Sequence, residues 1–205
     1  MSRYYSYLNS AIAILKQYDG IEPFAAFIKK HFSVNKKFGS KDRKTITNLC
    51  YCYFRLGNSL QSIPLDEKIL VALFLCSSSS DKLLEELKPE WNKKVSLALF
   101  EKRDFLSWQF IDKDIFLWKE EISEAIDKSA FIFSHLSQPD LFLRLRSGKE
   151  VAVITKLDKE NIPYTVISST CLALPNSSKI DKVIELNEEA VIQDHSSQRV
   201  AELLQ

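Results

Sequence analysis

The stretch FGSKDRKTITNLCYCYFRLG, residues 38–57, has the features of a core helix that follows a basic loop. Ser40 is a good N-cap residue, and Asp42 falls in the first turn, where a negative charge interacts favourably with the helix dipole. Gly57 is typical of a residue that ends a helix. Between them lies a stripe of residues at helical spacing that would face a core: Ile46, Leu49, Cys50, Tyr53 and Phe54.

The segments on either side of this stretch also repeat at helical spacing. Residues 4–18 carry apolar side chains at three- and four-residue steps, and Pro23 suits the first turn of a second helix. The nearly all-apolar run 69–76 has no polar face, which predicts a central helix surrounded by the others. Shorter helices are predicted for residues 81–87, 90–102 and 120–136. We therefore expect residues 1–136 to form an all-α helical bundle.

After Pro139 the spacing changes from helical to a two-residue repeat. Leucines at 141, 143 and 145 alternate with Phe142, Arg144 and Arg146, which predicts a strand. The remaining predicted elements are a helix over 149–159, strands over 164–168, 171–174 and 190–193, and a helix over 196–204. The last strand and helix need a partner sheet, because alone they bury too little surface. We expect a small α/β module over residues 137–187, so that the chain belongs to the α+β class.

Charge is distributed unevenly along the 205 residues, although the net charge is only +1. Residues 1–60 contain ten Lys and Arg against three Asp and Glu, whereas residues 61–140 contain ten against fifteen. The average composition hides this local excess of positive charge at the start of the chain, which favours an anionic partner.

The four cysteines at positions 50, 52, 76 and 171 have no disulfide or metal-ligand spacing, and the three histidines stand far apart. We expect reduced thiols in a cytoplasmic protein, and no metal. The apolar run 69–76 is far shorter than the roughly 20 residues of a membrane span, so no membrane association is expected.

A basic cluster is the feature most like a functional site. It consists of Lys29, Lys30, Lys36, Lys37, Lys41, Arg43 and Lys44. These cations could neutralise RNA phosphates, and the interleaved His31, Phe32 and Phe38 could stack on unpaired bases. Alternatively, the lysines solubilise the surface while the two phenylalanines pack inside.

Four arginines, one of them Arg43 of the cluster, have two interpretations each. Arg43, like Arg55, could hold the bundle together rather than touch RNA. Arg144 and Arg146 share one strand face with Phe142, as in surfaces that bind single-stranded RNA. Equally, Phe142 could belong to the core with both arginines solvated.

Residues 38–57, together with AVIQDHSSQRVAELLQ at 190–205, resemble the N-terminal region of bacterial ribosomal RNA cytosine-C5 methyltransferases of the Sun/Fmu branch of the NOL/NOP/Sun family. The resemblance implies a NusB-like bundle and places residues 188–205 at the lead-in to a methyltransferase domain. Gln193, Asp194 and Ser197 match a Gln-Asp-x-x-Ser element of that lead-in, although Asp194 or Ser196 could simply cap the last helix.

The family resemblance implies that this chain recognises substrate RNA, expected to be ribosomal RNA. S-adenosylmethionine and the catalytic cysteines would belong to a C-terminal methyltransferase domain of the full-length protein, so this chain would hold no cofactor and be inactive alone. One alternative is a free-standing NusB-like antitermination factor that binds RNA. Another is a protein-interaction module whose basic face meets an acidic partner.

Overall fold

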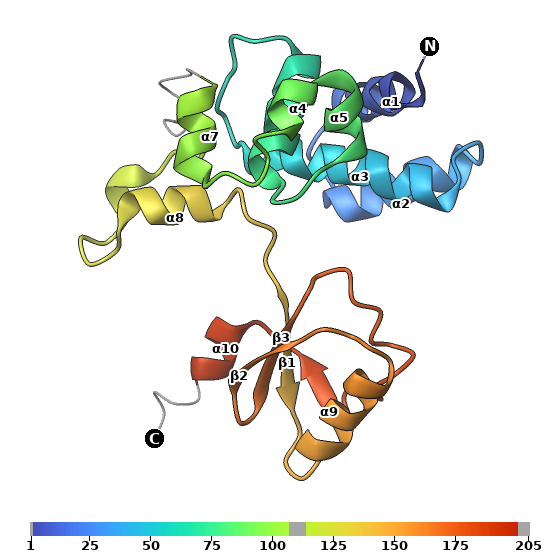
Figure 1. Cartoon of the computed structure of the whole chain (residues 1–205), viewed down its shortest axis with the longest axis vertical. Coiled ribbons are helices and arrows are strands. Elements are labelled where there is room, and N and C mark those ends of the chain that lie inside the picture. Colours follow the sequence, from blue (N-terminus) through green and yellow to red (C-terminus); the bar gives the residue numbers. More distant parts are fainter. Residues whose placement is uncertain (1, 107–113, 201–205) are drawn as a thin grey trace. The chain divides into compact units, whose positions relative to one another are not determined.

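A computed structural model describes residues 2–106 and 114–200 of the chain. They form two compact units, Met1–Ser137 and Gln138–Gln205, and each has its own hydrophobic core. The first unit is helical, and the second combines helices with an antiparallel sheet (Figure 1). The chain is therefore an α+β protein, as the change in residue spacing predicts.

The first unit consists of short and medium helices. They are α1 (Arg3–Gln17), α2 (Phe24–Val34), α3 (Ser40–Arg55), α4 (Leu65–Cys76), α5 (Lys82–Leu87), α6 (Pro89–Asn92), α7 (Leu99–Phe105), the 3-10 helix η1 (Lys119–Glu121) and α8 (Lys128–Ser134). The predicted central helix is confirmed, because all residues of α4 from Ile69 to Leu75 are buried. α1, α3, α5 and α7 all contact α4.

The ends of α3 differ in how well the sequence predicts them. Gly39, and not Ser40, is the N-cap residue, because the Asp42 carboxylate accepts the Gly39 N–H at 2.9 Å. At the other end, the Gly57 N–H donates to the Phe54 carbonyl at 3.1 Å, and Gly57 has a φ of +54°. Gly57 therefore ends the helix in the left-handed conformation that favours glycine.

Two of the helices predicted for the first unit, over residues 90–102 and 120–136, are wrong as continuous helices. The segment 90–102 is broken after Asn92, whose side chain accepts the Asp81 N–H and donates to Ser80, both at 2.9 Å. The segment 120–136 contains only the end of η1 and then α8, which Asp127 caps through the Ala130 N–H at 3.0 Å. Asp127 thus starts a new, shorter helix inside the predicted segment, by a hydrogen bond to backbone close to it in sequence.

The second unit is built on a four-stranded sheet in the order β2-β3-β1-β4, with all neighbours antiparallel. Its elements are β1 (Leu141–Leu145), α9 (Glu150–Lys159), β2 (Thr165–Ser168), β3 (Cys171–Leu174), β4 (Ala190–Ile192) and α10 (His195–Arg199). The predicted alternation in β1 is confirmed: Leu143 and Leu145 are buried in a core with Val153 and Leu157 of α9, whereas Arg144 is exposed.

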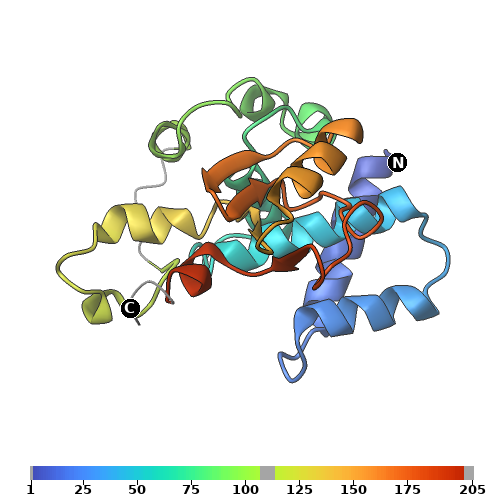
Figure 2. The same cartoon turned by 90° about the horizontal axis from the view of Figure 1, so that it is seen from below.

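The strand in the segment predicted to lead into another domain completes this sheet. β4 pairs with β1, with Ala190 opposite Leu145, and α9 and α10 lie on opposite sides of the sheet in both views (Figures 1 and 2). No side chain caps α10; Gln198 donates to the Gln193 carbonyl at 2.8 Å instead. The capping role considered for Asp194 or Ser196 is therefore wrong. The end of the predicted helix, residues 201–204, lies outside the described residues.

Candidate nucleic-acid interface

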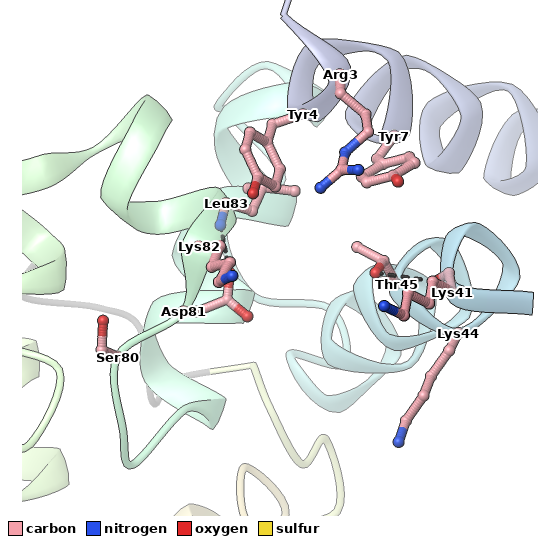
Figure 3. A pocket seen from close by; sticks show the side chains of 10 residues that line it. All are labelled: Arg3, Tyr4, Tyr7, Lys41, Lys44, Thr45, Ser80, Asp81, Lys82 and Leu83. Atoms are coloured by element: carbon pink, nitrogen blue, oxygen red, sulfur yellow. Dashed lines mark hydrogen bonds between the residues drawn. The ribbon is translucent and has the colours of Figure 1, made fainter.

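A pocket of about 440 Å³ opens on the first unit between three segments that are distant in sequence. They are the start of α1, the first turns of α3 and the beginning of α5 (Figure 3). The side chains that line it are those of Arg3, Tyr4, Tyr7, Lys41, Lys44, Thr45, Ser80, Asp81, Lys82 and Leu83. A concave surface with several polar groups is the usual form of a binding site.

The lining of this pocket is strongly positive. Arg3, Lys41, Lys44 and Lys82 are all exposed, and they face only one lining carboxylate, that of Asp81. Like charges gathered in a hollow raise the local concentration of counter-ions, because the low-dielectric walls focus their field. The pocket is therefore suited to an anionic ligand.

One wall of the pocket consists of an arginine against aromatic rings. The Arg3 guanidinium carbon lies 5.5 Å from the centre of the Tyr4 ring and 5.8 Å from that of Tyr7. Such distances are typical of cation–π contacts. Tyr7 is buried, and its hydroxyl donates to Asp42 at 2.5 Å, whereas Tyr4 remains partly exposed.

Asp42 contributes less free negative charge to this region than its position in the sequence suggests. Its two carboxylate oxygens accept from the Tyr7 hydroxyl and from the Gly39 N–H. These hydrogen bonds, with that of Tyr7 the larger influence, lower the pKa of Asp42 below its ordinary value. Asp42 thus ties α1 to the beginning of α3 and does not line the pocket.

Asp81 is held rigidly at the other side of the pocket. Its Oδ1 accepts the N–H groups of Leu83 at 2.8 Å and Leu84 at 3.4 Å, while its own N–H donates to Asn92. In Figure 3 the carboxylate points toward the space between α5 and α3. The hydrogen bonds through Oδ1 fix the direction in which Oδ2 is presented.

The structure divides the predicted basic cluster. Lys41 and Lys44 line the pocket, whereas the other four lysines of the cluster do not. Lys30 pairs with Glu22 at 2.7 Å. The others that lie outside the pocket are also exposed: Lys29 in the middle of α2, and Lys36 and Lys37 in the loop that follows it.

The aromatic residues of the cluster contact one another and the core: the His31 ring meets that of Phe32, and both His31 and Phe38 remain partly exposed. Phe32 is buried, Phe38 packs against the same core, and their rings meet edge to face at 5.6 Å. Arg43 donates through Nε to the Phe38 carbonyl at 2.9 Å, and its guanidinium lies 5.9 Å from the Phe32 ring. Both phenylalanines therefore pack against the core, as one of the two interpretations predicts. Arg43 holds the loop before α3 through its hydrogen bond to Phe38.

Arg55 also makes contacts within the helical bundle, which is one of the two roles considered for it. Its Nη1 donates to the carbonyls of His135 at 3.4 Å and Ser137 at 2.8 Å. These carbonyls follow the last turn of α8, where a cation is favoured by the helix dipole. Arg55 thereby joins the end of α3 to the end of α8.

In the second unit, Arg144 and Arg146 are exposed, but the ring beside them is occupied. Phe142 stacks on His195 of α10, with ring centres 5.6 Å apart and planes at 22°. Arg146 donates through Nε to the Asn187 carbonyl at 3.2 Å. Phe142 therefore belongs neither to the core beneath α9 nor to a free stacking surface.

Several pocket residues were not among those predicted from the sequence. Arg3, Tyr4, Ser80 and Lys82 line the pocket together with the predicted Lys41 and Lys44. The one local signal is that Arg3 and Tyr7 are four residues apart and thus share a helix face. Nothing in the sequence indicates that Lys82 lies near them.

The cysteines form no site of their own in the part of the chain that the structure describes. All four are free thiols, and burial raises the pKa of Cys50 to about 12. Among residues 2–106 and 114–200, no group of three or more metal-ligating side chains comes together, and no helix is long and apolar enough to cross a membrane.

Neither protein-family models nor curated proteins provide a relative of this chain. No protein-family model matches the chain, and no curated protein is significantly similar to it. What can be stated of its class is therefore structural: an α+β protein whose helical unit carries a cationic pocket.

Proposed function

We propose that this chain recognises RNA, and that it is the substrate-recognition portion of an S-adenosylmethionine-dependent ribosomal RNA (cytosine-C5) methyltransferase, without catalytic activity of its own. The observation that carries the proposal is the pocket between α1, α3 and α5, where Arg3, Lys41, Lys44 and Lys82 gather. The wider identity rests on the resemblance of residues 38–57 to the NusB-like region of that family.

RNA is the ligand class that fits both parts of the pocket lining. Four cations match phosphate oxygens, and the Arg3–Tyr4 wall offers flat surfaces on which an unpaired base can stack. An acidic protein would satisfy the charge, but it would not use the flat surfaces. Lysines at 29, 36 and 37, exposed nearby in sequence, would extend the positive surface along the RNA backbone.

The cofactor of the proposed enzyme would be bound by a separate methyltransferase domain. Only four glycines occur in the chain, and a glycine-rich loop of the kind that cradles a nucleotide is absent from its sequence. The residues present therefore do not fit S-adenosylmethionine, and we assign it no contacts here.

The proposal is tested by removing two pocket cations. In Lys41→Gln/Lys44→Gln, the affinity for a fluorescein-labelled ribosomal RNA fragment should fall about tenfold, and the slope of log K against log salt should flatten by about 1.4, or 0.7 for each lost phosphate contact. Fluorescence anisotropy over a salt series measures both.

The matched control is Lys16→Gln/Lys128→Gln, which removes the same charge from exposed positions of the same unit outside the pocket. Its affinity should remain within about twofold of the wild type, because distant surface charges are largely screened. Equal losses in the two variants would contradict a binding site at the pocket.

A further inference from the structure

The pocket has a feature that cations and aromatic rings alone do not explain: a fixed carboxylate among four positive charges. A carboxylate repels phosphate, so Asp81 weakens a site that is meant for the RNA backbone alone. Its Oδ1 is engaged by the backbone of α5. Within the described residues, its Oδ2 accepts no hydrogen bond, and it faces the pocket (Figure 3).

We propose that the pocket holds a single unpaired nucleotide and selects a base that carries an exocyclic amino group, which donates to Asp81 Oδ2. This inference rests on the proposed RNA-binding function and specifies the ligand of the same site. The base would lie against the Arg3–Tyr4 wall, and its flanking phosphates would meet Lys41, Lys44 and Lys82.

The dimensions of the pocket favour one unpaired nucleotide over a duplex. Its volume of about 440 Å³ is within the roughly 300–1,000 Å³ of small-ligand sites. In an A-form duplex the bases are stacked inside, and sequence-specific recognition of RNA accordingly targets single strands, loops and bulges. A base can reach Asp81 only when it is unpaired.

The chemistry of Asp81 favours cytosine over uracil. An ionised carboxylate only accepts hydrogen bonds, and cytosine presents the N4 amino group as a donor. Uracil presents the O4 carbonyl at the same place, so two acceptors would face each other. Adenine, which carries the N6 amino group, fits the same acceptor.

Asp81→Asn is the sharpest variant, because it exchanges an acceptor for a donor without changing shape. The side-chain carbonyl is expected to stay at Oδ1, where Leu83 and Leu84 donate to it, so the amide nitrogen takes the place of Oδ2. That nitrogen would donate to uracil O4 and face the cytosine amino group. The base preference should therefore invert.

The experiment measures the affinity of labelled nine-nucleotide oligo(C), oligo(U) and a nine-base-pair RNA duplex at one fixed salt concentration. The wild type should bind oligo(C) about tenfold more tightly than oligo(U), which is the discrimination of one good base contact, and the duplex more weakly than oligo(C). Asp81→Asn should bind oligo(U) at least as tightly as oligo(C).

Lys82→Gln is the control, since it removes a neighbouring phosphate contact and should weaken both single strands equally, leaving their ratio unchanged. If wild-type protein binds RNA but does not distinguish oligo(C) from oligo(U), the base-selective pocket is refuted while RNA recognition stands. If it binds no RNA, the proposed function itself fails. Should Asp81→Asn unfold, as a thermal melt would show, the wild-type ratio and the Lys82→Gln ratio still decide.

Discussion

Asp42 lies where the sequence predicts it, but its main role differs from the predicted one. Its place in the first turn of α3 is as predicted, but it acts mainly as an acceptor for Tyr7 of α1 and Gly39 at the helix start. It therefore links two elements rather than only favouring a helix dipole. Through this link Asp42 holds Tyr7, which lines the pocket together with Arg3.

The Asp42 contacts predict an acid-sensitive contribution to stability. Because the folded-state pKa of Asp42 is lowered, its contribution is fully present above the unfolded value near 4 and is lost as the pH falls through the folded pKa. Asp42→Asn should lower the free energy of unfolding at pH 7, and the difference from wild type should shrink below about pH 4. Urea denaturation at several pH values measures this difference.

Glu124→Gln is a suitable control for the Asp42 prediction, because Glu124 is exposed and lies in the same unit. Its difference from wild type should stay small and independent of pH. If Asp42→Asn also gave a constant difference between pH 3 and pH 7, the Tyr7 and Gly39 contacts would not be what lowers the Asp42 pKa.

At the scale of elements, the turn at Gly57 sets the direction in which the chain continues after α3. A Cβ atom on Gly57 would lie 2.2 Å from the Ile115 carbonyl oxygen. The Asn58 N–H donates to the neighbouring Asp114 carbonyl at 2.9 Å. The left-handed turn at Gly57 therefore lets two distant backbone segments approach each other.

Gly57→Ala should destabilise the first unit by about 3 kcal/mol, because it adds both left-handed strain and a steric overlap with backbone. Gly20→Ala is the matched control: Gly20 has a φ of +80°, but a Cβ there meets nothing within 4 Å. It should cost only the conformational part, about 1 kcal/mol. If both variants lost the same free energy of unfolding in chemical denaturation, the backbone at Ile115 would be able to move away from the added Cβ without cost.

Elements differ in how well the sequence predicts them because their stabilising contacts differ in range. α4 and β1 follow from local spacing, since a buried helix and a half-buried strand leave a periodic pattern. The start of α8 depends on one hydrogen bond, from the Ala130 N–H to Asp127, and the side chain of Asn92 bonds to residues 80 and 81 rather than to its own helix. Helical spacing continues through such residues, so periodicity alone does not reveal the break.

At the scale of the whole molecule, residues 2–106 and 114–200 form two cores, and no buried residue among them belongs to both. The first is centred on α4, and the second lies between α9 and the sheet. Residues 137–140, which connect the units, are exposed. Such an arrangement allows the two units to unfold independently.

Leu143→Ala tests that independence, because Leu143 is fully buried in the second core. The substitution should destabilise the second unit by about 2–5 kcal/mol through lost burial and a cavity. Hydrogen exchange should then accelerate in β1, β3 and β4, while the amides of α4 keep their wild-type protection. Faster exchange in α4 by the same factor would mean that the two units unfold as one.

The sequence by itself determined the class of this protein, the central helix, the change to strand spacing after Pro139 and the positive charge of the first 60 residues. Each of these is a property of neighbouring residues. Only the tertiary structure decided that β4 closes the sheet, that Phe38 packs against the buried Phe32, and that Arg3, Lys44 and Lys82 share one pocket. Roughly forty residues separate each of these cations from the next along the chain. What brings them together is the packing of α1, α3 and α5 around a common core, which local spacing does not encode.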